Sequence, residues 1–570
     1  MVEKASLGTL LSFFNPCAKE VLPTSHNTLA RYTDPPLCRY LDKSDTLGLV
    51  GSFVQISDDE KPQRVRVLLG LQEVAGHSGE NQGRVIAPIL EEFDIMGKIG
   101  CVMGDNSGTN DTLCRFLSSR FESLETTTTP KWVAQEMRGR CLGHMINLIV
   151  NAFLSNKEIC EETEEEDLWV TITTTSYEEA HHQEKEKGKK AGRKKQTSSK
   201  LEPIAALTKL HGIAVHIRNS SGHAKEFRRL AGRLIPQDNA TRWNSWFTMV
   251  KVACEKEAAV LKYTLNNRSD LREKFLTDED WKELRKIRDF LKVFHEATLR
   301  SEGDHGSIGH TLVLLNALHE CVTDEIGETE SHGMQQRLKK CQSTIHNWWK
   351  RCTRESPLYI LSVMLQPQYR TELFSAWGGV YGEETVAQAR ERATAFWQQY
   401  KQASGTDSIQ PPAPPAPPSQ KKKKKTNSTK MSALTSKLHA LTIAPPRPRD
   451  ELTDYLLSNL NSDIQKLGLQ GYSNSSLIEW WYKQRHQWPT LSRFAIEILS
   501  IAAMSDDVER VFSGCRRTIS WERARLGVDK VEAVECLGSW FPLNAEDEVG
   551  GLGDDSEDFS IDSDSEDDKE

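Results

Sequence analysis

Two kinds of apolar spacing follow one another in the first part of the chain. Residues 46–74 hold two apolar runs rich in β-branched residues, and the polar stretch 57–63 lies between them. Such runs bounded by turn formers are typical of strands, so the pattern predicts a β-hairpin. In the next segment apolar side chains recur at intervals of three and four, which predicts a helix with one buried face. They are Ile86, Ile89, Leu90 and Phe93.

The segment that follows predicts another strand and another helix. An apolar run ends at Asp105, residues 106–110 form a Gly/Asn/Ser turn, and residues 112–121 show helical spacing. The inward-facing residues of this helix would be Leu113, Phe116 and Leu117. Hairpin, helix, strand and helix in this order indicate a mixed α/β sheet.

Helical spacing dominates residues 251–403. Thr277 stands before a long amphipathic segment, and Asp280 follows three residues later, which approximates a capping box. The apolar stripe of this segment is Trp281, Leu284, Ile287, Leu291 and Phe294. The region therefore predicts an all-helical domain. Helical sequence resumes at Asp450 and is rich in tryptophan, with Trp480, Trp481 and Trp488.

Three charged or proline-rich segments interrupt these patterns. Residues 156–200 change from acidic to basic and are too polar to pack, and residues 405–449 combine a proline-rich run with five lysines. Residues 546–570 carry thirteen acidic residues and one Lys, so the rest of this chain of net charge −8 is mildly basic at +4. That balance suits a nucleic-acid binder. The basic run 185–195 is either a nuclear-import signal or a solvated linker.

Length and cysteine usage narrow the class of protein. A chain of 570 residues exceeds one hydrophobic core, so two to four domains are expected. Its twelve cysteines include no C-x-x-C pair, which argues against a disulfide framework or a zinc ribbon. No apolar stretch of about 18 residues is present. We therefore expect a soluble, intracellular protein that has reduced thiols and does not bind a membrane.

The region around residues 491–541 has the most informative pattern. Its motifs are P-x-L at Pro489, A-x-x-x-L at Ala495, S-x-x-x-E-R-V-F-S at Ser505 and R-x-R-L at Arg523. This order resembles the C-terminal dimerisation region of hAT-superfamily DNA transposases. The resemblance implies that Glu509 is the last of three metal-binding carboxylates of a ribonuclease H-like nuclease. The alternative is a surface glutamate paired with its neighbour Arg510.

Two further segments resemble parts of the same family. Residues 104–110 resemble its second-Asp motif, which implies that Asp105 is a metal ligand, whereas D-N-S-G alone is an ordinary turn. Residues 140–148 contain C-x-x-H, which in the family opens a helix that shapes the active site and its DNA contacts. The alternative is a buried Cys141 beside a hydrogen-bonded His144, because a zinc site would need two more ligands.

Residues 238–245 resemble the family's T-R-W-x-S element. Arginine can hold a phosphate with two hydrogen bonds, and tryptophan can stack on an unpaired base. This assigns a DNA contact to Arg242 and Trp243. The alternative is a core tryptophan beside an exposed arginine.

The first carboxylate of the family is not recognisable. The run before Leu47 lacks the family's Asp followed by W-T-S, and it contains two prolines that do not fit a central strand. Asp34 has the nearest spacing, and Asp42 and Asp45 fit less well. A zinc-finger spacing around Cys17 or Cys38 is also lacking. The resemblance therefore leaves catalytic competence open.

The resemblance implies a fold and an order of domains. The fold class is α/β plus all-α: a ribonuclease H-like mixed sheet interrupted by a large helical insertion domain, with a helical C-terminal dimerisation region. The domains are an N-terminal segment 1–44, a ribonuclease H-like part 45–155, a charged insertion 156–200, the ribonuclease H-like continuation 201–250, the helical insertion 251–404, a linker 405–449, the dimerisation region 450–545 and an acidic tail 546–570.

Two functions compete at this stage. The first is a nuclear DNA transposase that binds transposon ends, forms a homodimer or higher oligomer, and uses Mg²⁺ or Mn²⁺ at Asp105, Glu509 and Asp34 for cleavage and strand transfer. The second is a catalytically inactive, transposon-derived DNA-binding or dimeric scaffold protein. No small-molecule substrate is expected. The residues expected to support dimerisation are Phe494, Ile498, Leu499, Val511, Phe512 and Leu537.

Overall fold

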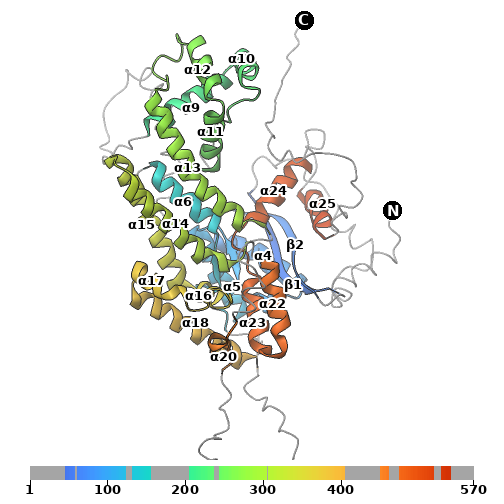
Figure 1. Ribbon diagram of the computed structural model, residues 1–570. Coiled ribbons are helices and arrows are strands. Elements are labelled where there is room, and N and C mark those ends of the chain that lie inside the picture. The colour runs from blue at the N-terminus through green and yellow to red at the C-terminus, as the bar shows by residue number, and fades with distance from the viewer. Residues whose placement is uncertain are drawn as a thin grey trace, which may run out of the picture.

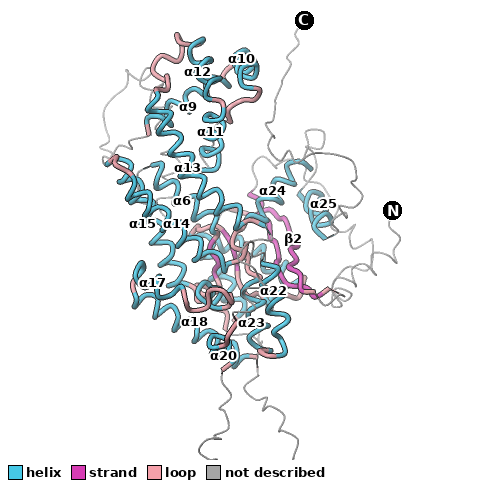
Figure 2. Tube along the Cα trace, in the orientation of Figure 1, coloured by secondary structure: helices cyan, strands magenta, loops and turns pink. Residues whose placement is uncertain are grey.

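In the computed structural model most of the described residues are helical, and the described strands form two separate pairs (Figure 2). The residues that the structure describes are 45–57, 61–76, 78–122, 131–155, 204–236, 243–303, 306–404, 450–460, 474–518 and 528–540. The N-terminal segment 1–44, the charged insertion 156–200, the linker 405–449 and the acidic tail 546–570 lie outside these ranges. None of the described helices has the length and apolarity that a membrane crossing requires.

The predicted hairpin is confirmed. Strand β1 (Asp45–Ile56) pairs antiparallel with β2 (Pro62–Val74), and the register shifts between Leu49 and Val50. Pro62 can begin β2 because the first residue of a strand tolerates proline.

The two helices predicted after the hairpin pack against each other. Helix α4 (Gly79–Glu92) buries Ile86, Ile89 and Leu90, and α5 (Gly108–Phe121) buries Leu113 and Leu117. Phe93, the C-cap of α4, and Phe116 are half-buried. A Cβ on Gly79 would lie 2.2 Å from the Thr109 carbonyl oxygen, so only glycine permits this approach. Helix α5 begins earlier than residue 112 because Ser107 provides its N-cap. A short 3-10 helix, η1 (Met96–Lys98), leads from α4 towards the next strand.

The second strand pair corrects the expectation of one mixed sheet. Strand β3 (Val102–Gly104) pairs parallel with β4 (Arg138–Arg140), and each has three residues. Within the described ranges no hydrogen-bond ladder joins this pair to the hairpin. Strand β3 ends after three residues because the turn at Asp105 and helix α5 follow it directly. The edge of β2 that does not pair with β1 is covered by a C-terminal helix. The structure is therefore mainly helical with two small sheets.

Helix α6 (Leu142–Ser155) lies at the centre of the helical body and is buried on nearly all sides. Its neighbours include α11, α13 and α15. The helices that follow it are α9 (Ala205–Arg218), α10 (Ser221–Ala231), α11 (Trp243–Glu255), α12 (Glu257–Asn266), α13 (Asp278–Ser301), α14 (Ile308–Glu328), α15 (His332–Glu355), α16 (Leu358–Met364), α17 (Leu373–Tyr381) and α18 (Glu383–Ala403). The predicted helical character of residues 251–403 is confirmed (Figure 1).

The C-terminal helices pack on this body and on the hairpin. They are α20 (Glu451–Leu457), α22 (Asn474–Lys483), the 3-10 turn η5 (Gln484–His486), α23 (Pro489–Leu499), α24 (Asp506–Thr518) and α25 (Val528–Trp540). Phe494 of α23 contacts the rings of Trp397 and Tyr400 of α18, with centroids 5.2 and 4.5 Å away. The C-terminal region thus packs against the helical body.

Helix α25 covers the edge of β2 that β1 leaves open. The Leu68 N–H donates to Ser539 Oγ, and the Leu71 N–H donates to Glu532 Oε1, both at 2.8 Å. The Leu68 carbonyl accepts a hydrogen bond from Trp540 Nε1, also at 2.8 Å. Side chains therefore satisfy backbone groups that would otherwise form an exposed strand edge.

The predicted capping box at the start of α13 also joins two helices. Thr277 and Asp280 exchange the side-chain-to-backbone hydrogen bonds of a capping box, and Asp280 Oδ2 accepts a hydrogen bond from Lys209 Nζ of α9 at 2.6 Å. Burial alone would raise the pKa of Asp280, but the bonds from Lys209 and Thr277 outweigh it and lower the pKa. The folded structure therefore favours the ionised carboxylate.

We predict that Asp280→Asn lowers stability in a pH-dependent way. The folded pKa is below the unfolded value of about 3.9, so the ionised carboxylate contributes fully above about pH 4, and the contribution is lost as the pH falls through the folded pKa. Thermal unfolding midpoints should differ at pH 7 by the equivalent of about 1–3 kcal/mol and converge in acid. Asp278→Asn, at an exposed position on the same turn, is the control. A difference that persists unchanged in acid would contradict this account.

Candidate functional site

Asp105 is the first residue after β3, and its side chain is exposed. Its Oδ1 accepts hydrogen bonds from the Ser107 N–H at 3.1 Å and from Asn110 Nδ2 at 2.6 Å. Oδ2 has no hydrogen-bond partner among the described residues. The carboxylate is thus held at the N-terminus of α5, where the helix dipole favours negative charge. The predicted location, a carboxylate in the turn after a strand, is confirmed.

Two buried arginines of β4 support the backbone at this position. Arg138 donates from Nη2 to the Asp105 carbonyl oxygen, and its Nε lies 3.3 Å from Asp111 Oδ1. Arg140 pairs with Asp111 at 3.2 Å and with Glu355 at 2.8 Å. Burial acts to lower the pKa of Arg140, but Glu355 and Asp111 outweigh it and raise the pKa. The Arg140 guanidinium therefore remains charged, and Arg138 holds the backbone of the candidate ligand.

Sequence reasoning missed Arg138, Asp111 and Glu355. Arg140 was noticed only as the residue before C-x-x-H. Asp111 stands on α5 and Glu355 at the end of α15, so no local spacing pointed to their meeting. A buried R-G-R strand followed by a helix start was the only available signal.

Cys141 and Leu142 join three distant parts of the chain. The Cys141 N–H donates to the Gly104 carbonyl at 3.0 Å, which extends the contact between β3 and β4. The Leu142 N–H donates to the Ala503 carbonyl at 2.9 Å. The Ser505 N–H donates to Cys141 Sγ at 3.4 Å. We call these three bonds the Cys141 junction; they hold the end of β3, the start of α6 and the residues before α24 together.

The C-x-x-H residues therefore stand where a helix opens beside Asp105. Cys141 is buried, and burial raises the pKa of its thiol. A neutral, buried thiol is not the thiolate that zinc binds. His144 is half-buried in the first turn of α6. The helix start is confirmed, whereas a role in DNA contact stays a prediction.

Glu509 stands in the first turn of α24, close in sequence to the Cys141 junction. Its side chain lies outside what the structure describes, so the expected approach of its carboxylate to Asp105 stays a prediction. Helix α24 itself packs on the hairpin: Val508 Cγ1 would lie 3.0 Å from a Cβ placed on Gly48. The backbone of the helix is thus placed against β1.

Two neighbouring aspartates hold the start of α24. Asp506 Oδ2 accepts hydrogen bonds from the Gly303 N–H at 3.2 Å and from Arg510 Nη2 at 2.7 Å. Asp507 forms an ion pair with Arg66 of β2. Burial raises the pKa of Asp507 despite that arginine. Arg510 forms ion pairs with both aspartates, Asp506 and Asp507.

The Thr-Arg-Trp element is only partly visible. Arg242 lies outside the described residues. Trp243 is 4% exposed and its ring packs near Phe247 and Phe294. The backbone N–H of Trp243 donates to Asn147 Oδ1 at 3.3 Å. The structure thus has the core tryptophan of the alternative interpretation, and a base could stack on this ring only after the ring moved.

Asp34, the expected first carboxylate, lies outside the described residues. The same is true of Asp42, and the side chain of Asp45 at the start of β1 is likewise not described. The third ligand position therefore stays a prediction.

The residues expected to support dimerisation fall into two groups. Phe494, Ile498 and Leu499 are at most 5% exposed and belong to the chain's own core. These three side chains pack within the chain, and their part in a subunit contact stays a prediction. Val511 and Phe512 are half-buried in a small cluster with Leu71, Cys515 and Val531. Leu537 of α25 is 45% exposed, and so is Val534, at 51%.

Two family models match the chain. The hAT family C-terminal dimerisation region matches residues 451–541, and the ZBED1 RNase-like helical domain matches residues 139–290. The first covers the helices from α20 to α25, and the second runs from β4 into α13.

The chain is also similar to several curated proteins. It is 24% identical over 472 residues to tpeD of Talaromyces stipitatus, provisionally named a transcriptional regulator; the match covers 81% of this chain and 48% of that protein. Zinc finger BED domain-containing protein RICESLEEPER 2 of Oryza sativa subsp. japonica is 24% identical over 371 residues; the match covers 59% of this chain and 48% of that protein. Zinc finger BED domain-containing protein DAYSLEEPER of Arabidopsis thaliana is 22% identical over 312 residues; the match covers 54% of this chain and 41% of that protein.

The chain spans about half the length of the curated relatives it matches. The chain is therefore similar to hAT and ZBED proteins: it matches the hAT C-terminal dimerisation region and the ZBED1 RNase-like helical domain in two separate segments.

Proposed function

We propose that this protein is a hAT-type, transposase-like DNA-binding protein in which Asp105 and Glu509 hold Mg²⁺ or Mn²⁺ for strand cleavage and transfer. The Cys141 junction carries the proposal. It ties the carbonyl before Asp105 to the segment that leads into α24, although about 400 residues separate the two in sequence. This is the arrangement that two carboxylates of one metal site require.

The residues at this site suit a hard divalent ion. Asp105 presents an exposed carboxylate. Its Oδ1 accepts hydrogen bonds at the start of α5, and its Oδ2 accepts none from the described residues. Oxygen ligands of this kind are preferred by Mg²⁺ and Mn²⁺. Bound ions would activate a water or a 3′-hydroxyl and stabilise the leaving oxygen. The protein's own part is to orient the ligands, which Arg138 does by binding the Asp105 carbonyl.

A second candidate function is a catalytically inactive DNA-binding or dimeric scaffold protein. The absence of a recognisable Asp with W-T-S before β1 favours it, because loss of a ligand shared by two ions would remove most activity. The relative provisionally named a transcriptional regulator agrees with such a role. Both functions place the protein on DNA in the nucleus, with transposon ends as the expected target of the first.

Self-association is supported by the match to the hAT dimerisation region. The described apolar side chains that remain available for it on α25 are Val534 and Leu537, which are three residues apart. That spacing puts them on one helical face. We therefore propose that this face contributes to the subunit contact.

Cys141→Ala should loosen the start of α24. The substitution removes the acceptor of the Ser505 N–H, which is worth about 1 kcal/mol, so amide exchange in residues 503–510 should accelerate roughly fivefold. Hydrogen-exchange mass spectrometry measures this. Cys341→Ala, a matched change at another buried cysteine, should leave the same peptide unchanged. Equal exchange of residues 503–510 in wild type and both variants would show that the Cys141 junction does not hold the start of α24.

Metal-dependent nicking of DNA tests the proposed chemistry. If the site is complete, Asp105→Asn and Glu509→Gln should each reduce nicking in Mg²⁺ or Mn²⁺ on the order of 100-fold or more, because each removes a metal ligand. Asp94→Asn and Glu497→Gln are matched controls at other exposed or half-exposed acids. Nicking unaffected by either site variant would rule out the assignment. Salt-sensitive DNA binding without nicking in wild type would select the inactive alternative.

Leu537→Glu should shift the chain towards monomer in light scattering at micromolar concentration. A carboxylate on an apolar contact face loses burial and adds a desolvation cost. Because Leu537 is exposed within the chain, the unfolding midpoint of the monomer should change little. Leu299→Glu, at another exposed leucine, is the control. An unchanged oligomeric state in Leu537→Glu would exclude this face.

A further inference from the structure

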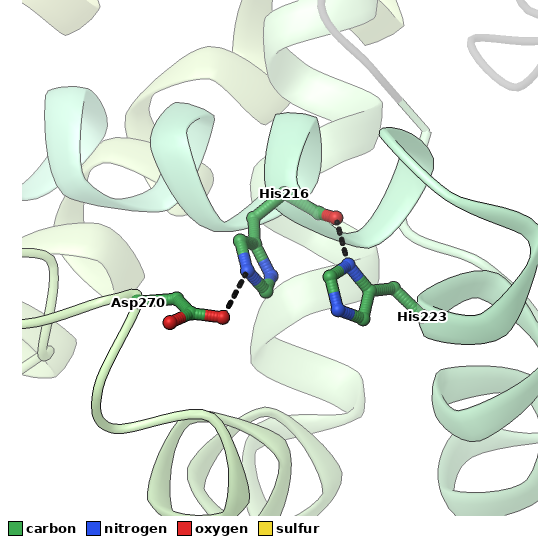
Figure 3. A group of neighbouring side chains, drawn as sticks. All are labelled: His216, His223 and Asp270. Carbon is green, nitrogen blue, oxygen red and sulfur yellow. Dashed lines mark hydrogen bonds and ion pairs between the residues drawn. The ribbon is translucent and has the colours of Figure 1, made fainter.

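Two histidines and an aspartate meet where α9, α10 and α12 lie together, at the end of the helical body away from α5 (Figures 1 and 3). His216 lies in the last turn of α9, His223 in the first turn of α10, and Asp270 in the turn after α12. Each offers one ligand atom, and these atoms lie within 4.8 Å of one another. Within the described residues, this is the group of His, Cys, Asp or Glu side chains that satisfies such a geometry.

We infer that His216, His223 and Asp270 form a binding site for a zinc-class transition-metal ion that fastens α9, α10 and the turn after α12 together. Two imidazole nitrogens and one carboxylate oxygen match the ligands of zinc sites that keep a fourth position for water. Imidazole ligands also disfavour Mg²⁺ and Ca²⁺, which take oxygen. This site is therefore chemically different from the one proposed at Asp105 and Glu509.

The hydrogen bonds around His223 prepare it for a metal. Its Nδ1 lies 3.2 Å from the His216 carbonyl oxygen, which can only accept, so Nδ1 carries the proton. In the neutral ring, Nε2 then keeps its lone pair. Metal-binding histidines commonly donate their other ring N–H to a backbone carbonyl in this way.

His216 has a corresponding second partner. Its Nδ1 lies 2.9 Å from the hydroxyl of Tyr263, which is buried, and its Nε2 lies 3.8 Å from Asp270 Oδ2. When Nδ1 donates to the tyrosine oxygen, Nε2 presents its lone pair on the side of the carboxylate. The other carboxylate oxygen, Oδ1, accepts a hydrogen bond from Ser269 Oγ at 2.9 Å, which orients Asp270.

The two imidazole rings stack on each other. Their centroids are 4.3 Å apart with an interplanar angle of 19°, so the two histidines come together although they stand on different helices.

The three ligand atoms lie within 4.8 Å of one another and would have to move closer to bind zinc. Bonds of about 2.0–2.2 Å in a tetrahedral site put ligand atoms about 3.4 Å apart. The 3.8 Å between His216 Nε2 and Asp270 Oδ2 is already close to that value. Asp270 is more than half exposed and stands in a turn, so it can close on the ion and leave one position for water.

Zinc titration of the full-length, EDTA-treated chain tests the inference. We expect Asp270→Asn and His223→Gln each to weaken Zn²⁺ binding in calorimetry at least about tenfold, since each removes a ligand. Zn²⁺ should raise the thermal midpoint of wild type and of His332→Gln, a control at an exposed histidine, but not of Asp270→Asn. Mg²⁺ should not reproduce the rise.

Asp270→Asn keeps the shape of an exposed side chain, so its midpoint without metal should equal that of wild type and shows that it is folded. This variant alone decides the matter if His223→Gln fails to fold. Co²⁺ in place of zinc should give visible bands of a four-coordinate nitrogen and oxygen site in wild type, and Asp270→Asn should lose them. Equal Zn²⁺ affinity in wild type and Asp270→Asn would overturn the inference.

Discussion

The arrangement of this protein depends on buried backbone groups that find partners far away in sequence. The first N–H groups of a helix have no partner within the helix, and a buried one must be satisfied elsewhere. At the start of α6 the Leu142 N–H binds the Ala503 carbonyl, while Cys141 binds Gly104 on one side and Ser505 on the other. A single helix start thereby sets the position of both the β3 end and the α24 start.

The buried charges near this junction are also paired with partners that are distant in sequence. Two buried arginines could not remain in the core without counter-charges, because an unpaired buried ion is costly. Asp111 and Glu355 supply them. The consequence is a supported turn that carries an exposed carboxylate at Asp105, next to two paired arginines. A rigid ligand on a supported turn is what metal chemistry needs.

A comparable constraint shapes the hairpin and the C-terminal helices. An open β2 edge would pair readily with another chain. Ser539, Glu532 and Trp540 of α25 occupy backbone groups of that edge. Association between copies therefore has to use side chains, and the exposed apolar face of α25 is a suitable surface. The group of His216, His223 and Asp270 lies in a separate part of the molecule. Its imidazole nitrogens are softer ligands than carboxylate oxygens, so the two proposed sites can be distinguished by the metal that each binds.

The sequence by itself determined the local elements and a resemblance to one family. Spacing of apolar residues was enough for the hairpin, for α4 and for the stripe of α13, because these patterns depend only on neighbours three or four residues away or on alternate residues. Motif order pointed to hAT transposases, and the family matches agree. The sequence also placed Asp105 at a strand end, since a strand and a turn are both local.

Only the tertiary structure decided which side chains face the core, the solvent or one another. Phe494 has the same apolar character as an interface residue, yet the rings of α18 bury it, and Trp243 is likewise a core residue. The expected continuous sheet gave way to two strand pairs, because ladder formation depends on which edges come together. The meetings of Arg138 with Asp111, and of His216 with Asp270, join residues with no shared local pattern. Such contacts depend on how packed helices bring distant segments together, which spacing along a chain does not encode.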